Sequence, residues 1–159
     1  MTQSPLLIDN SMLEQLIAEA RALPRRRKNL NFHRSNEAAS HRLIIAIEPD
    51  SYIPPHRHAN PSKDETITVL RGSLGLICFD AQGQVTHTAT LAANGDALGV
   101  TLPHGMLHSL VALESGSVFF ESKAGPYAPP AANERVDWAP AENTPEAAAY
   151  HARLRALFA

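Results

Sequence analysis

Three histidines and a glutamate are spaced in the sequence so that they could bind one metal ion. His56 and His58 stand two residues apart in PPHRHANPSKDETITVLRG, and Glu65 follows seven positions after His58. On an extended segment, side chains two apart point to the same side at a separation of about 7 Å. The proline-containing loop that follows can turn Glu65 toward the same side. His108, in the segment PHGMLH, is the best candidate for a further ligand.

Neutral imidazoles and a carboxylate suit a divalent first-row metal ion. Three histidines and one glutamate leave one or two positions open on an octahedral ion, which suits Fe(II), Mn(II), Ni(II) or Zn(II). An open position permits polarisation of a substrate oxygen, deprotonation of bound water or activation of dioxygen. We therefore expect one divalent ion per chain as cofactor, and the residue types do not choose among the four metals.

Short β-type runs separated by turn residues would position these ligands. Between residues 42 and 123 the runs are RLIIAIE, TITVL, SLGLICF, QVTHTATL, ALGVTL, HSLVAL and SVFFESK. Turn signals such as RG, DAQG, NG, PHG and ESG lie between them. Many short strands without intervening helices are typical of an antiparallel sandwich or barrel. The sequence predicts a mainly β, single-domain antiparallel barrel over residues 42–123.

Helices are expected on both sides of this barrel. Residues 1–41 combine an amphipathic helix, for which Ser11 and Glu14 fit a capping box, with the basic stretch PRRRKNLNFHRS, read as an arm or edge strand. Residues 124–159 are rich in Pro and Ala and end in a helix with Thr144 as its predicted cap. This tail is expected to dock on the barrel or to contact a second copy, and edge strands favour a homodimer.

Composition argues against two classes of partner. The formal net charge is −2 and the sequence pI is about 6.4, so no basic excess favours nucleic acid or an anionic membrane surface. No segment approaches the roughly 18 apolar residues of a membrane span, and the first residues lack a signal-peptide pattern. The sequence predicts a cytoplasmic protein whose partner is a small molecule.

The ligand candidates and their turn residues resemble the two motifs of the cupin superfamily. The positions that match are His56, His58, Glu65 and Gly72 for the first motif, and Pro103, Gly105 and His108 for the second. This resemblance implies a small jelly-roll β-barrel with a three-histidine, one-glutamate metal site inside. The gap between His58 and Glu65 is longer than that motif usually has, and Ala112 stands where the second motif often has Asn. Asp64 or a water in place of Glu65 remains an alternative ligand.

Within that superfamily, the chain is similar to the WbuC family of cupin-fold metalloproteins, often encoded beside genes for cell-surface polysaccharide synthesis. The similarity covers about residues 8–127 and rests on RRRKNLNFHRS, RLIIAIEPDSYIPPHRH and ESKAGPY. It implies a metal-binding cupin that acts on a small anionic or sugar-derived metabolite in polysaccharide synthesis.

Three kinds of function remain open at this point. The first is a metal-dependent isomerase, epimerase, lyase or dioxygenase. The second is a non-catalytic binding or sensor module that captures a small anionic ligand, and the third is a structural metal site in an interaction protein. An internal site with an open position is more than a structural metal needs, which slightly favours an enzyme.

The basic arm supplies candidate contacts to the ligand. On an extended arm, alternation places Arg27, Asn29 and His33 on one face. The guanidinium group of Arg can donate two parallel hydrogen bonds to a carboxylate or phosphate, and an amide can bond to sugar hydroxyls. The expected ligand is therefore anionic and rich in oxygen. Glu121 and Lys123 could also contact it, or could form a same-face ion pair. The predicted substrate contacts are Arg27, Asn29, His33, Tyr52, Glu121 and Lys123, and no catalytic residue is assigned.

Overall fold

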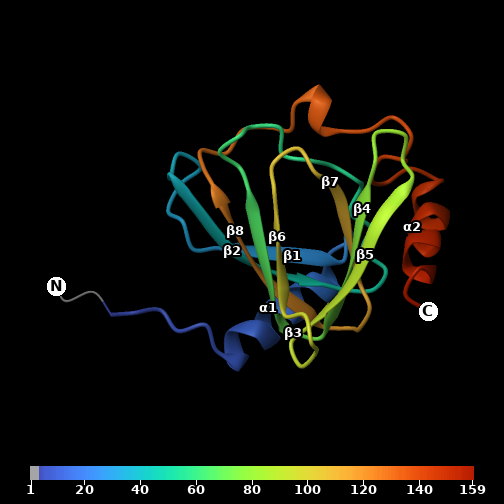
Figure 1. Cartoon of the computed structure of the whole chain (residues 1–159). Helices are drawn as coiled ribbons and strands as arrows, with labels where there is room; N and C mark the ends of the chain where they lie inside the picture. The colour runs from blue at the N-terminus through green and yellow to red at the C-terminus, as the bar shows by residue number, and fades with distance from the viewer. Residues whose placement is uncertain (1–3) are drawn as a thin grey trace.

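The computed structural model describes residues 4–159 as two antiparallel β-sheets with one α-helix on each side (Figure 1). The first three residues of the predicted N-terminal segment lie outside the described residues. The strands are β1 (Arg27–Asn31), β2 (Ser40–Ile47), β3 (Glu65–Arg71), β4 (Ser73–Phe79), β5 (Val85–Ala92), β6 (Gly99–Leu102), β7 (Leu107–Ala112) and β8 (Ser117–Ala124). One sheet has the order β1-β2-β8-β3-β6 and the other β5-β4-β7. This jelly-roll sandwich confirms the predicted mainly β, single-domain fold.

Alternation along the strands fills the space between the sheets. Inward positions of β3, β7 and β8 carry Ile67, Leu110 and Phe119, which belong to one buried apolar cluster. Glu65 precedes Ile67 by two residues, and His108 precedes Leu110 by two, so both polar side chains share the inward face of their strands. The pattern that builds the core therefore also aims two candidate ligands into the barrel.

A tight turn at Gly72 carries the chain from β3 in one sheet to β4 in the other. Gly72 has φ +70°, and a Cβ at this position would collide with Ser117. Both constraints favour glycine at a position where the backbones approach closely.

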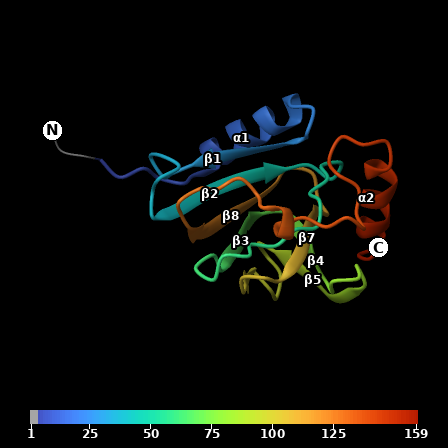
Figure 2. The ribbon, with the colours of Figure 1, turned by 90° about the horizontal axis from the view of Figure 1, so that it is seen from above.

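Helix α1 (Asn10–Ala22) lies outside the five-stranded sheet, over β1 and β2 (Figure 2). Its buried face packs against the outward residues of β2 and β8, chiefly Ile44 and Val118. The predicted cap at Ser11 is wrong, because the Asp9 side chain accepts the hydrogen bond from the Met12 backbone N–H at 2.9 Å. An Asp or Asn side chain can cap a helix as well as a Ser side chain can, and Asp9 stands two residues before Ser11.

A buried carboxylate fastens the end of α1 to the sheets. Glu48 accepts hydrogen bonds from Arg21 Nε (2.9 Å), Ser115 Oγ (2.6 Å) and the Gly116 backbone N–H (3.0 Å). Burial by itself would raise the pKa of Glu48, but these donors hold it below its usual value.

The basic arm forms β1, an edge strand paired with β2 in the register Arg27↔Ile47, as the edge-strand alternative predicts.

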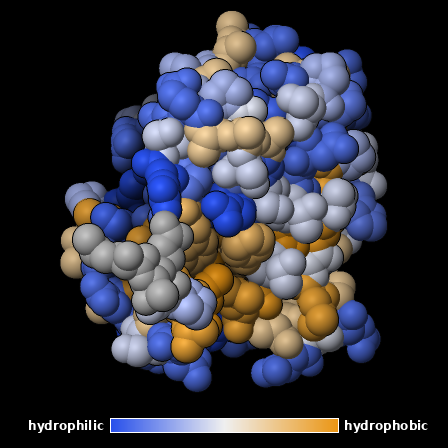
Figure 3. Space-filling model, turned by 90° about the vertical axis from the view of Figure 1, so that its left-hand side faces the viewer, coloured by the Kyte–Doolittle hydropathy of each residue, from blue (hydrophilic) through white to orange (hydrophobic). Residues whose placement is uncertain are grey.

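Leu6, Leu7 and Ile8 precede α1 and are exposed. Figure 3 shows apolar residues gathered on the lower part of the face from which this end of the chain projects. The homodimer expected from edge strands stays a prediction.

The tail packs against the outer face of the three-stranded sheet and ends in α2 (Ala147–Ala156), which lies at the right-hand end of the molecule in Figure 2, apart from α1. Trp138 anchors it, since its ring lies 5.3 Å from that of Phe79 and its Nε1 donates to the Ala81 carbonyl. The predicted cap at Thr144 is wrong: its hydroxyl donates to the Ala141 carbonyl, and α2 begins after Glu146 without a side-chain cap. Within residues 4–159, no helix combines the length and apolarity that crossing a membrane requires.

Candidate metal centre

The backbone holds two of the candidate ligands opposite each other. His56 lies in an extended loop that forms an isolated antiparallel bridge with His108 of β7. The His56 N–H donates to the His108 carbonyl at 3.0 Å, and the His108 N–H donates to the His56 carbonyl at 2.9 Å. Gly105, with φ +81°, donates its N–H to the His58 carbonyl at 2.7 Å. The loop and the PHGMLH turn are thereby joined along their length.

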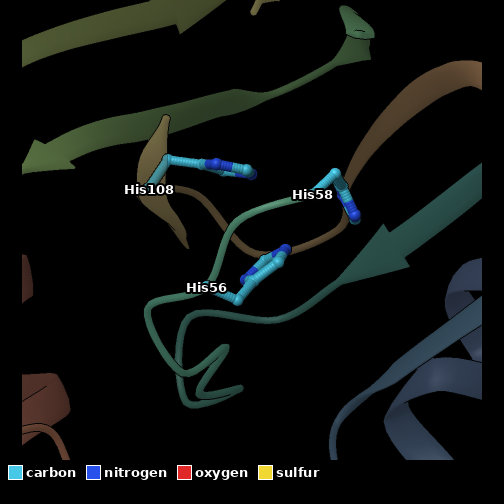
Figure 4. A group of neighbouring side chains, drawn as sticks. All are labelled: His56, His58 and His108. Carbon is cyan, nitrogen blue, oxygen red and sulfur yellow. The ribbon is translucent and has the colours of Figure 1, made fainter. Parts of the chain in front are cut away.

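The three imidazoles converge on one point. One ring nitrogen from each of His56, His58 and His108 lies within 4.8 Å of the others. Figure 4 shows the rings directed toward a shared space, two from the loop and one from β7. Glu65 borders this group, because its Oε2 is 3.2 Å from Nε2 of His108 and 3.4 Å from Nε2 of His58. The structure therefore brings together the four residues that the sequence spacing selected.

Backbone carbonyls determine which nitrogen of two rings is available. Nδ1 of His56 lies 2.9 Å from the Pro54 carbonyl, and Nδ1 of His108 lies 2.9 Å from the Met106 carbonyl. A carbonyl only accepts, so each Nδ1 carries the proton and each Nε2 keeps a lone pair. This second hydrogen bond is the usual way in which a metal-binding histidine is oriented.

Two buried atoms at the centre of this group lack hydrogen-bond partners within residues 4–159. They are Nε2 of His58 and Oε2 of Glu65. The carboxylate oxygen also faces the lone pair of His108 Nε2 at 3.2 Å, and two lone pairs at that distance require a positive charge between them. A divalent cation would supply that charge, so the donor set fits a metal ion.

Protonation states at the site suit metal binding. Burial, reinforced by the neighbouring His108, lowers the pKa of His56 to about 4. Burial would raise the pKa of Glu65, but the adjacent imidazoles of His108 and His58 and the charge of Lys123 hold it well below its usual value. Near neutral pH, His56 is a neutral imidazole and Glu65 is a carboxylate, which are the forms that bind metals.

A cavity of about 260 Å³ lies inside the barrel beside the histidines. Lys123 Nζ donates to Glu121 Oε1 at 2.7 Å and lies 3.6 Å from Glu65 Oε1. Burial, followed by the charge of Glu65, raises the pKa of Glu121 to about 7. The same-face pair considered from the sequence therefore forms, and it stands in the wall of this cavity.

Four of the six predicted substrate contacts line the inner cavity: Arg27, Asn29, Glu121 and Lys123. Arg27 is engaged, since its guanidinium donates to Ser51 Oγ (3.1 Å), the Tyr52 carbonyl (3.0 Å) and Glu142 Oε2 (3.0 Å). It therefore provides a fixed positive charge at the cavity wall.

The other two predicted contacts lie apart from the inner cavity. His33 stacks on His41 at 4.0 Å between ring centroids. Tyr52 is buried under the tail, where its hydroxyl donates to the Pro140 carbonyl at 2.8 Å. Asp64, the alternative ligand, is engaged at the surface, accepting from the His104 backbone N–H at 2.8 Å.

The tail contributes site residues that the sequence reasoning did not identify. Glu142 pairs with Arg27, and Glu134 contacts the loop that carries His56 and His58. The available signal was their acidic character, and this does not specify which partner each would reach.

Solved structures share this architecture at low sequence identity. KdgF from Halomonas sp. is 18% identical over 64% of this chain and 82% of its own, with a TM-score of 0.50. The SPY1581 protein of unknown function from Streptococcus pyogenes is 13% identical over 80% of this chain and 93% of its own, with a TM-score of 0.52. A mutant of Bacillus subtilis oxalate decarboxylase OxdC aligns less well, with 20% identity over 57% of this chain and 22% of its own, and a TM-score of 0.46.

These similarities concern the fold. KdgF is a cupin-fold protein, and the two sheets of this chain form the same jelly roll. The expected cupin architecture is therefore confirmed, while similarity to the WbuC family stays a prediction. A search of curated proteins gives no match. Residues 8–91, just over half of the chain, match a family model, so the protein belongs to the family described as a domain of unknown function (DUF6016).

Proposed function

We propose that this protein is a metal-dependent cupin whose ion is held by His56, His58, His108 and Glu65. The observation that carries the proposal is that His58 Nε2 and Glu65 Oε2 are buried without hydrogen-bond partners while the His108 Nε2 lone pair faces Glu65 Oε2 at 3.2 Å, an arrangement that an added cation would satisfy. When bound, such an ion would polarise a substrate oxygen or lower the pKa of a bound water.

The cavity beside the ligands favours an enzyme that moves a proton on a small anionic substrate. Lys123 and Arg27 provide positive charge at the wall, and the Asn29 amide can contact hydroxyl groups. Glu121 is a titratable group beside the ligands and is not one of them, which is what general acid or base catalysis needs. An isomerase, epimerase or lyase acting on an oxygen-rich acid or sugar derivative uses all of these groups.

The resemblance to the WbuC family supports a narrower form of this proposal. A sugar-derived substrate in cell-surface polysaccharide synthesis would present the hydroxyl and anionic groups that this cavity suits. The alternative, a module that binds the same ligand without converting it, predicts the same metal site and differs only in turnover.

A metabolite screen separates these functions. Protein loaded in turn with Fe(II), Mn(II), Ni(II) and Zn(II) is incubated with sugar acids, sugar phosphates and sugar nucleotides, and both mass change or isomer conversion and thermal shift are recorded. We expect conversion that Glu121→Gln abolishes while its metal content is retained, and that the exposed control Glu37→Gln preserves. Binding without conversion for all four metals would favour the binding module.

A further inference from the structure

A second, larger cavity of about 780 Å³ adjoins the candidate metal centre from outside the barrel. One wall is the loop that carries His56 and His58, and the other is the tail between residues 127 and 142. Ile53, His56 and Lys123 line both this outer cavity and the inner one. The two cavities therefore share a boundary at the candidate ligands.

The tail is fixed in place as a wall of the outer cavity. Glu134 accepts the backbone N–H of Ala59 at 2.8 Å through Oε1 and that of Ala131 at 2.9 Å through Oε2. Arg57 donates its backbone N–H to the Glu134 carbonyl at 3.1 Å and its Nε to the Asn133 carbonyl at 2.7 Å. These bonds connect the tail directly to the histidine loop, so the outer cavity is a built feature of the fold.

Most of the lining is rigid and apolar. The proline residues in it are Pro54, Pro55, Pro129, Pro130 and Pro140. Proline has a fixed φ, so such walls lose little conformational freedom when a ligand binds. Volumes of about 300–1,000 Å³ with apolar walls and a few polar groups are typical of ligand sites.

The charges around the outer cavity favour an anion. Its two acids are already engaged, Glu134 by backbone N–H groups and Glu142 by Arg27. By contrast, no carboxylate among the described residues lies within ion-pair distance of the cations Arg57, Lys63 and Arg135, which also line it. Cations without carboxylate partners around an apolar cavity attract an organic anion.

We propose that the outer cavity binds the apolar body of an organic acid whose oxygen-bearing end reaches the candidate metal centre. This inference rests on the proposed function and adds the substrate class to it. The inner cavity accommodates a small polar head, and the outer cavity is about three times as large. The ligand is therefore an acid with an extended apolar chain or ring, larger than a single sugar.

Two hydroxamates that differ only in their apolar chain test this inference. Acetohydroxamate and hexanohydroxamate present the same metal-chelating head, and the longer probe adds four methylene groups. Binding of each to Zn(II)-loaded wild-type protein is measured by calorimetry. We expect hexanohydroxamate to bind about 200-fold more tightly, because each of its four additional methylenes contributes about 0.8 kcal/mol when buried.

Variants locate the apolar subsite. Ala139 is a half-buried residue of the tail wall, and Ala139→Trp should remove most of the advantage of the longer probe while leaving acetohydroxamate affinity and zinc content unchanged. Ala128→Trp makes the same change at a more exposed position of that wall, for use if the first variant folds poorly. Ala97→Trp, exposed in the turn between β5 and β6, is the matched control.

The outcomes separate this inference from the proposed function. If the protein takes up no Zn(II), the metal centre fails and the inference fails with it. If the protein holds Zn(II) and neither probe binds, the inference alone is overturned, because no ligand head reaches the ion. If acetohydroxamate binds and hexanohydroxamate binds no more tightly, the metal centre stands and the apolar subsite is overturned. An unchanged preference for the longer probe in both tail variants would also overturn it, because the chain would then lie elsewhere.

Discussion

Metal binding should stabilise the wild-type protein and should not stabilise the His108→Ala variant. His108 is buried, and its Nε2 lies 3.2 Å from Glu65 Oε2, at the centre of the converging donors. An ion that binds only the folded state adds about 2.7 kcal/mol when its concentration is about 100 times its dissociation constant. For a chain of this size, 1 kcal/mol corresponds to about 2–4 °C in Tm. We therefore expect the Tm of the wild type to rise by about 5–10 °C.

The assay compares each variant with its own metal-free form. Protein stripped with a chelator is unfolded thermally with and without added Zn(II), and bound metal per chain is measured by elemental analysis. His87→Ala is the matched control, because His87 is exposed on β5 and undergoes the same chemical change. The reasoning is refuted if the wild type gains no stability from the metal, or if His108→Ala gains as much as the control.

Three other changes test the surrounding structure. Burial lowers the pKa of His151, so its contribution to stability is complete above about pH 6.5 and is lost as the pH falls through the lowered folded-state value. Urea unfolding on both sides of about pH 6.5 should show a smaller loss of stability in His151→Gln than in wild type, and an equal loss would contradict this role of His151. Glu48→Ala removes the acceptor of three donors, of which the Gly116 N–H is buried, and should lower the free energy of unfolding by about 1–3 kcal/mol. Chemical denaturation measures this loss against the exposed control Glu37→Ala, which should change by less than about 0.5 kcal/mol. Glu134→Ala should speed hydrogen exchange at the Ala59 backbone N–H about tenfold, because that N–H loses a charged acceptor. Exchange at the wild-type rate would show that Glu134 does not hold the tail against the histidine loop.

The arrangement into strands and turns could be predicted because its signals are local. The alternation of side chains along a strand places Ile67 and Phe119 on the inward face of β3 and β8. Gly72 meets the requirement for a positive φ at its own position. The cap of α1 was harder to predict, since both Asp9 and Ser11 have side chains able to accept the bond. Packing of the whole apolar face of α1 decides between such neighbours, and that is not a local property.

The candidate site was partly predictable for the same reason. His56 and His58 share a side because they are two apart on an extended segment. The position of Glu65 depends on the register that sets it opposite Lys123 in the β3–β8 pair and Leu102 in the β3–β6 pair. Spacing along the chain suggests this register, and only the assembled sheet determines it.

The role of the tail was decided by the tertiary structure alone. Its Pro and Ala content predicts a segment that docks somewhere, and nothing in that composition specifies the partners. In the folded chain, Glu142 pairs with Arg27 across 115 positions of sequence and Glu134 contacts Ala59 across 75. Local patterns encode backbone preference and the side on which a residue lies, whereas contacts at such separations depend on how every intervening element packs. The candidate ligands could therefore be identified from the sequence, and the outer cavity that adjoins them could not.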